Sequence, residues 1–125
     1  MKRVSIELEF LFKASPAILY QFLTQPSNLV RWFCDKADVE EEVFTFTWKG
    51  YSETAELVDD IEEERLRFHW TDAPKTEYLE YRMFHADITN ETILQITDFC
   101  DELDAKDQRA LWTSQIKQLR IEIGG

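Results

Sequence analysis

Apolar side chains recur at helical spacing near the carboxyl end of the chain, and polar residues fall largely between them. A helix drawn through residues 104–123 would carry them on one narrow face. A helix of about 20 residues is roughly 30 Å long, enough to cross a small sheet. We therefore expect one long helix that buries a single stripe. This stripe consists of Ala105, Trp112, Ile116, Leu119 and Ile123.

Both ends of this helix carry recognisable signals. Asp104 is expected as the N-cap, with Asp107 three places on in the reciprocal capping position. Residues 124–125 are both glycine, which takes the left-handed conformation that closes many helices. We therefore expect the helix to end at Ile123.

The first residues alternate between apolar and polar side chains, as in a strand with one buried face. Ser15 and Pro16 then suit the N-cap and first position of a short helix, which Pro26 ends. A second short helix is expected from residue 27 or 28 through Trp32 to Phe33. The buried face of the first strand would contain Val4, Ile6, Leu8, Phe10 and Phe12.

A two-residue period returns at Asp38 and continues to Cys100, which predicts five antiparallel strands. Turn signals separate them at residues 49–52, 59–64, 72–75 and 87–91. The expected inner faces contain Phe44, Phe46, Trp48, Ala55, Leu57, Leu66, Phe68, Trp70, Leu79, Tyr81 and Met83.

The predicted order is strand, two short helices, five strands and a long helix. Consecutive hairpins indicate an antiparallel meander. We therefore expect a single α+β domain over residues 1–125 with a helix-grip arrangement. In it a curved antiparallel sheet of about six strands surrounds the long C-terminal helix.

Several segments together are typical of one known family. They are Ala14, Ser15 and Pro16, then 19–24, 26–33, 46–50, Leu111 and Trp112. Through them the chain resembles the START-like superfamily, also called Bet v 1-like or helix-grip. Within it, the short length resembles proteins related to the activator of the heat-shock-90 chaperone ATPase. The resemblance covers nearly the whole chain, and its motifs are structural rather than catalytic.

This resemblance implies a cavity but leaves its chemistry open. Members of the family bind sterols, lipids, hormones or polyketide intermediates, some cyclise polyketides, and some act as co-chaperones. The chain ends soon after Ile123, so the helix is expected to cover less of the sheet than in larger members.

The net charge is −11 over 125 residues, and no cluster of Lys and Arg offsets it. Such a chain repels nucleic-acid phosphates and anionic membrane surfaces at long range, which excludes a nucleic-acid binder. A basic protein partner, or simple solubility, fits the charge better. Acidic residues gather at 38–42 and 59–64, where solvated turns are the simpler interpretation.

Cys34 and Cys100 have no neighbours at metal-ligand spacing. The amino terminus lacks an apolar core of signal-peptide length, and no apolar run is long enough for a membrane span. We therefore expect a cytoplasmic protein with two reduced thiols that serve in packing. A disulfide between them stays an alternative.

Large rings make up the candidate ligand site, because they combine apolar area with a few polar groups. The alternative is that the same rings fill the core solidly. A ligand would enter between the second short helix and the sheet, near Trp32 and Trp112. The candidate ligand-binding residues are Trp32, Phe46, Trp48, Phe68, Trp70, Tyr81, Phe99, Trp112 and Ile116.

Few titratable groups suggest catalysis. Asp98 is expected to be exposed or near a turn, although burial would make it a possible acid or base. His85 could face a cavity, whereas His69 is expected to be exposed. Glu80 and Arg82 could form an internal ion pair or lie on a solvated face.

We therefore predict the binding of a small apolar or amphipathic ligand, with no cofactor and no metal. A protein-interaction or co-chaperone-like role through the acidic surface is the first alternative. A cyclase- or hydrolase-like enzyme is the second. The chain is expected to be a monomer or a homodimer.

Overall fold

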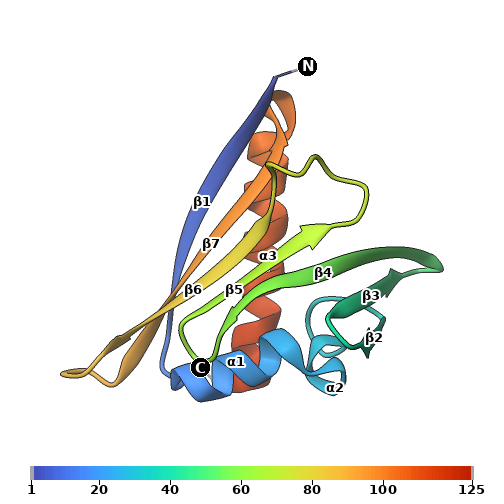
Figure 1. Ribbon diagram of the computed structural model, residues 1–125. Coiled ribbons are helices and arrows are strands. Elements are labelled where there is room, and N and C mark those ends of the chain that lie inside the picture. The colour runs from blue at the N-terminus through green and yellow to red at the C-terminus, as the bar shows by residue number, and fades with distance from the viewer. Residues whose placement is uncertain (1, 125) are drawn as a thin grey trace.

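The computed structural model describes residues 2–124, which form one antiparallel sheet and three α-helices. The strand order is β1-β7-β6-β5-β4-β3-β2, and every neighbouring pair is antiparallel. Figure 1 shows the sheet curving around α3, with α1 and α2 near the carboxyl end of that helix. The strands are β1 (Arg3–Phe12), β2 (Lys36–Glu40), β3 (Val43–Trp48), β4 (Tyr51–Ile61), β5 (Arg65–Trp70), β6 (Leu79–Ala86) and β7 (Glu91–Asp101). The helices are α1 (Pro16–Thr24), α2 (Pro26–Leu29), the 3₁₀ turn η1 (Glu102–Asp104) and α3 (Ala105–Ile123).

The predicted α+β arrangement is present, but the sheet has seven strands rather than about six. The additional strand arises because the chain turns between Glu40 and Val43, which pair with each other. Glu41 takes a left-handed φ of 58° in this turn. Glutamate rarely adopts that conformation, so the sequence carries no ordinary turn signal there.

The C-terminal helix lies where the apolar period places it, with one difference at its start. Asp104 makes no capping hydrogen bond through its side chain, because the chain is already in the 3₁₀ turn η1. The expected capping pair with Asp107 is therefore wrong. At the other end Gly124 takes a left-handed φ of 93° and closes the helix, as expected.

The segment before β2 differs from the expected pair of helices in length. Ser15 caps α1 by accepting a hydrogen bond from the Ile18 amide at 3.3 Å. The next helix, α2, stops at Leu29, and the chain continues in turns through Trp32. The Trp32 indole donates to the Phe22 carbonyl at 2.9 Å, so this ring belongs to the core between the short helices.

The inner face of the sheet and one stripe of α3 form the core. The alternation predicted for the strands is present, and most inner residues of β3, β5, β6 and β7 are buried, with Trp48 and Trp70 half-buried. Cys34 and Cys100 are also buried, with free thiols. Within residues 2–124, no helix has the length and apolar character needed to cross a bilayer. The buried residues of α3 are Trp112, Ile116 and Leu119.

We expect Ile116→Ala to lower the free energy of unfolding by about 2–5 kcal/mol, because it leaves a void beneath the helix. Ile116 is fully buried, whereas Ile121 on the same helix is 63% exposed. Ile121→Ala is the matched control and should cost less than about 0.5 kcal/mol. Urea unfolding followed by circular dichroism measures both. Equal losses would contradict the packing described here.

Candidate functional site

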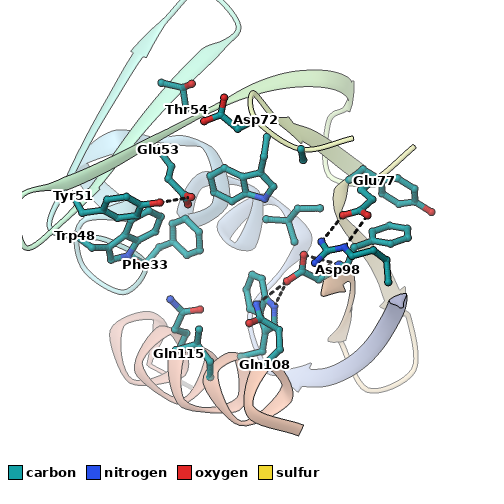
Figure 2. A pocket seen from close by; sticks show the side chains of 18 residues that line it. Phe33, Trp48, Tyr51, Glu53, Thr54, Asp72, Glu77, Asp98, Gln108 and Gln115 are labelled. Atoms are coloured by element: carbon teal, nitrogen blue, oxygen red, sulfur yellow. Dashed lines mark hydrogen bonds and ion pairs between the residues drawn. The ribbon is translucent and has the colours of Figure 1, made fainter. Parts of the chain in front are cut away.

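A cavity of about 590 Å³ lies between the inner face of the sheet and the amino-terminal half of α3 (Figure 2). Pockets of this volume hold small organic molecules in other proteins. The helix contributes Gln108, Leu111, Trp112 and Gln115, so its contacts with the cavity span two turns. The cavity opens to solvent where its lining includes the exposed side chain of Tyr51.

Aromatic side chains form the wall toward β3 and β5. The Phe46 ring lies behind this wall, 6.0 Å from the Trp48 ring and 5.7 Å from the Trp70 ring. The Trp48 indole donates to the Phe33 carbonyl at 2.6 Å. These contacts hold both indole rings in place, because each ring packs against Phe46 behind the cavity wall.

A buried carboxylate lies at the inner end of the cavity. Asp98 is 8% exposed and accepts hydrogen bonds from the Trp112 indole at 2.8 Å and from the Gln108 amide at 3.0 Å. Its other oxygen accepts from the Phe99 backbone amide at 2.8 Å. The expectation that Asp98 is exposed is therefore wrong. Asp98 faces inward because it lies two residues after the buried Ile96 on the same strand, β7.

An ion-pair group closes the same end of the cavity. Arg3 on β1 donates through Nε to Glu77 at 3.0 Å and through Nη1 to Asp101 at 3.0 Å. The hydrogen bond with Arg3 holds the pKa of Glu77 below its usual value, although partial burial opposes this shift. Arg3 therefore ties the first strand to β7 and to the loop before β6.

Polar groups also surround the opening. Tyr51 donates its hydroxyl proton to Glu53 at 2.8 Å, and both side chains line the cavity. This hydrogen bond raises the pKa of Tyr51. Asp72, in the loop after β5, lines the same opening. Figure 2 shows these three side chains around one end of the cavity, away from Asp98.

The structure divides the nine candidate ligand-binding residues into two groups. Four of them line the cavity, and the other five are buried in the surrounding core. Trp32 belongs to the second group, so it does not border an entrance. The lining group is Trp48, Trp70, Phe99 and Trp112. The core group is Trp32, Phe46, Phe68, Tyr81 and Ile116.

Several lining residues escaped the sequence reasoning. Gln108 and Gln115 lie four places before and three places after Trp112, so helical spacing alone places them beside it. Glu53 and Tyr51 continue the alternation of Ala55 toward the start of β4. That periodicity is a usable signal, but the turn expected over residues 49–52 includes Tyr51, which is the first residue of β4 in the structure.

The remaining titratable candidates lie outside the cavity. His85 is exposed near the turn between β6 and β7, 3.7 Å from Asp87, so the cavity interpretation for it is wrong. His69 is half-buried rather than exposed, with Nε2 3.2 Å from the Pro74 carbonyl. The structure therefore brings neither histidine to Asp98. Within residues 2–124, no three side chains of the metal-binding types converge on a common point.

Glu80 and Arg82 form an ion pair on the outer face of the sheet, so the alternative of an internal, inward-facing pair is wrong. Glu80 is buried because it lies between two arginines, 2.7 Å from Arg67 and 2.8 Å from Arg82. Desolvation is the largest single effect and acts to raise the pKa of Glu80, but the hydrogen bonds and charges of the two arginines together outweigh it, so the pKa is lowered. The group is part of the sheet and not of the cavity.

Known proteins resemble this chain along its whole length. A family model described as a START-like superfamily domain matches residues 1–125. The solved structure of BfR322 from Bacteroides fragilis is 34% identical, with a TM-score of 0.70 over 98% of this chain and 92% of that chain. No curated protein matches the chain.

Two more distant structures show the same fold. The Aha1 dimer from Colwellia psychrerythraea has a TM-score of 0.80 and 17% identity over 94% of this chain and 93% of that chain. CalU16 from Micromonospora echinospora has a TM-score of 0.74 and 19% identity, covering 95% of this chain and 75% of that chain.

We expect Trp112→Phe to lower the free energy of unfolding by about 1–3 kcal/mol, because it leaves buried Asp98 with one donor fewer. The loss of ring area contributes as well, so a double-mutant cycle with Asp98→Asn separates the two effects. If the hydrogen bond matters, the second substitution costs less in the Trp112→Phe background than alone. Additive losses would show that the bond contributes nothing.

Glu77→Gln should destabilise the protein at neutral pH and matter less in acid. The folded-state pKa of Glu77 lies below its usual value, so its stabilising pairing with Arg3 is present above the unfolded pKa. That contribution is lost as the pH falls through the folded pKa. Unfolding free energies from urea titrations at several pH values measure the difference. Glu102→Gln, at an exposed pair with Lys2, is the control and should show no such trend.

Proposed function

The chain belongs to the START-like superfamily, and from this membership we propose that it binds a small apolar or amphipathic molecule in the cavity between its sheet and α3. Members of the superfamily bind hydrophobic ligands. The observation that carries the proposal is the cavity of about 590 Å³, bordered by three indole rings. These rings are Trp48, Trp70 and Trp112.

The rings supply the apolar area that drives binding. Each buried methylene of a ligand contributes about 0.8 kcal/mol, and micromolar affinity corresponds to about 8 kcal/mol, so about ten such groups are needed before the cost of association is counted. A few polar groups at opposite ends would orient the molecule, as in most small-molecule sites. Tyr51 provides one such group at the opening, and the Gln115 amide on α3 provides another along the wall.

Of the nine predicted ligand-binding residues, the four that line the cavity are the proposed contacts. The other five support the binding site by holding these four side chains in position. Phe46, for example, packs against two of the lining indoles and fixes their positions. The proposed entrance lies between Tyr51 and Leu111, both exposed, and not beside buried Trp32.

We expect the uncharged probe N-phenylnaphthylamine to bind at one site and to gain fluorescence on leaving water. Gln115→Trp should weaken this binding by about tenfold or more, because the larger ring occupies the cavity beside Trp112. Gln118 lies on the same helix outside the cavity and is exposed. Gln118→Trp is therefore the matched control and should bind the probe as the unmodified chain does.

Three results would count against a cavity ligand. The probe could fail to bind, it could bind at many weak sites, or both tryptophan variants could bind it equally well. Circular dichroism of each variant confirms that the fold is retained before the titrations are compared.

A further inference from the structure

Ionised groups around the cavity are mostly negative. Its lining contains four carboxylates but one cationic side chain, Arg3, among the residues the structure describes. Arg3 is already paired with Glu77 and Asp101. It therefore offers no free positive charge to a bound molecule. The four carboxylates are Glu53, Asp72, Glu77 and Asp98.

Three of these carboxylates have no compensating cation. Asp98 receives hydrogen bonds only from uncharged donors, two side chains and one backbone amide. Glu53 accepts from the neutral hydroxyl of Tyr51. Within residues 2–124, no Lys, Arg or His lies within ion-pair distance of Glu53, Asp72 or Asp98. The ends of the cavity therefore carry uncompensated negative charge, buried at Asp98 and exposed to solvent at Glu53 and Asp72.

The sheet register places Glu53 beside the indoles of the wall. Glu53 pairs with Phe46, and Trp48 pairs with Tyr51, so all four side chains share one face. Trp70 pairs with Ala55, two residues along the strand from Glu53. Diagonal neighbours on a sheet are about 7–8 Å apart, within reach of long side chains. A charged group held near the Glu53 carboxylate would thus lie beside two indole rings.

Carboxylates and indole faces attract the same kind of group. A positive charge is favoured by a carboxylate, and the negative face of an indole attracts it further when water is excluded. A negative charge would be repelled by both and would find Arg3 occupied. Figure 2 shows Tyr51 and Glu53 beside Trp48, with Asp72 at the same end of the cavity and the helix on the other side.

We propose that the ligand of this cavity is a cationic amphiphile, an apolar molecule that carries a protonated amine or quaternary ammonium group. Its charge lies at the opening between Glu53 and Asp72, against Trp48 and Trp70. Its apolar body extends inward along Trp112. This assignment rests on the proposed function and adds the sign of the ligand's charge. It excludes fatty acids and other apolar anions as preferred ligands.

Three probes that share one carbon skeleton test the proposed sign of the ligand's charge. Phenylbutylamine, phenylbutanol and phenylbutanoate differ only in the end group, which is positive, neutral and negative at pH 7. Isothermal titration calorimetry at fixed ionic strength should show the amine binding about tenfold tighter than the alcohol, with the carboxylate weakest. Equal binding of amine and alcohol overturns the charge assignment, while alcohol binding still supports the cavity. Failure of all three probes overturns both proposals.

Matched variants separate a local effect from the net charge of −11. Glu53→Gln with Asp72→Asn removes two carboxylates from the opening, and the ratio of amine to alcohol affinity should fall to about one. Glu62→Gln with Glu63→Gln removes the same charge from an exposed turn outside the cavity lining and should leave the ratio unchanged. An equal fall in both double variants would mean that the whole surface attracts the amine, which overturns the site.

Discussion

The position of the C-terminal helix depends on a buried carboxylate that needs hydrogen-bond donors from the helix. Asp98 lies on the inner face of β7, where an ionised group is costly unless several donors reach it. The Trp112 indole and the Gln108 amide, one turn apart on α3, supply two of these donors. The helix cannot slide or rotate without leaving this oxygen unpaired. A polar contact thus fixes the position of α3 along the sheet, because the apolar stripe alone would allow the helix to pack in several positions.

The cavity lies where the amino-terminal half of α3 faces β3, β4 and β5, whereas the helix is held against β1 and β7. Gln108 and Trp112 in this half of the helix hydrogen-bond Asp98 on β7. Toward its carboxyl end α3 packs through Ile116 and Leu119, and Glu122 pairs with Arg31 at 2.8 Å. Trp112 lies at the boundary, so the same residue anchors the helix and borders the cavity. Stability and binding are therefore linked through one side chain.

Periodicity predicted most of the fold, because buried faces require it. The long helix, the first helix and the inner faces of the strands all follow from apolar spacing. Two features could not be predicted from apolar spacing, the first because it lacks an ordinary turn residue and the second because it depends on a distant partner. Glu41 turns without glycine or asparagine, and Glu80 is buried only because Arg67 covers it from the neighbouring strand. Asp98 was misplaced for the second reason, since its two side-chain donors lie ten and 14 residues away along the chain.

The four indole N–H signals in a proton–nitrogen NMR spectrum test the central claim most directly, because they report on the cavity and the core separately. Trp48, Trp70 and Trp112 line the cavity, whereas Trp32 is buried outside it and donates to the Phe22 carbonyl. Titration with a bound apolar amine should shift the three cavity signals together and leave the Trp32 signal in place. A shift of Trp32 alone, or of no indole at all while the amine binds, would contradict a ligand site between the sheet and α3.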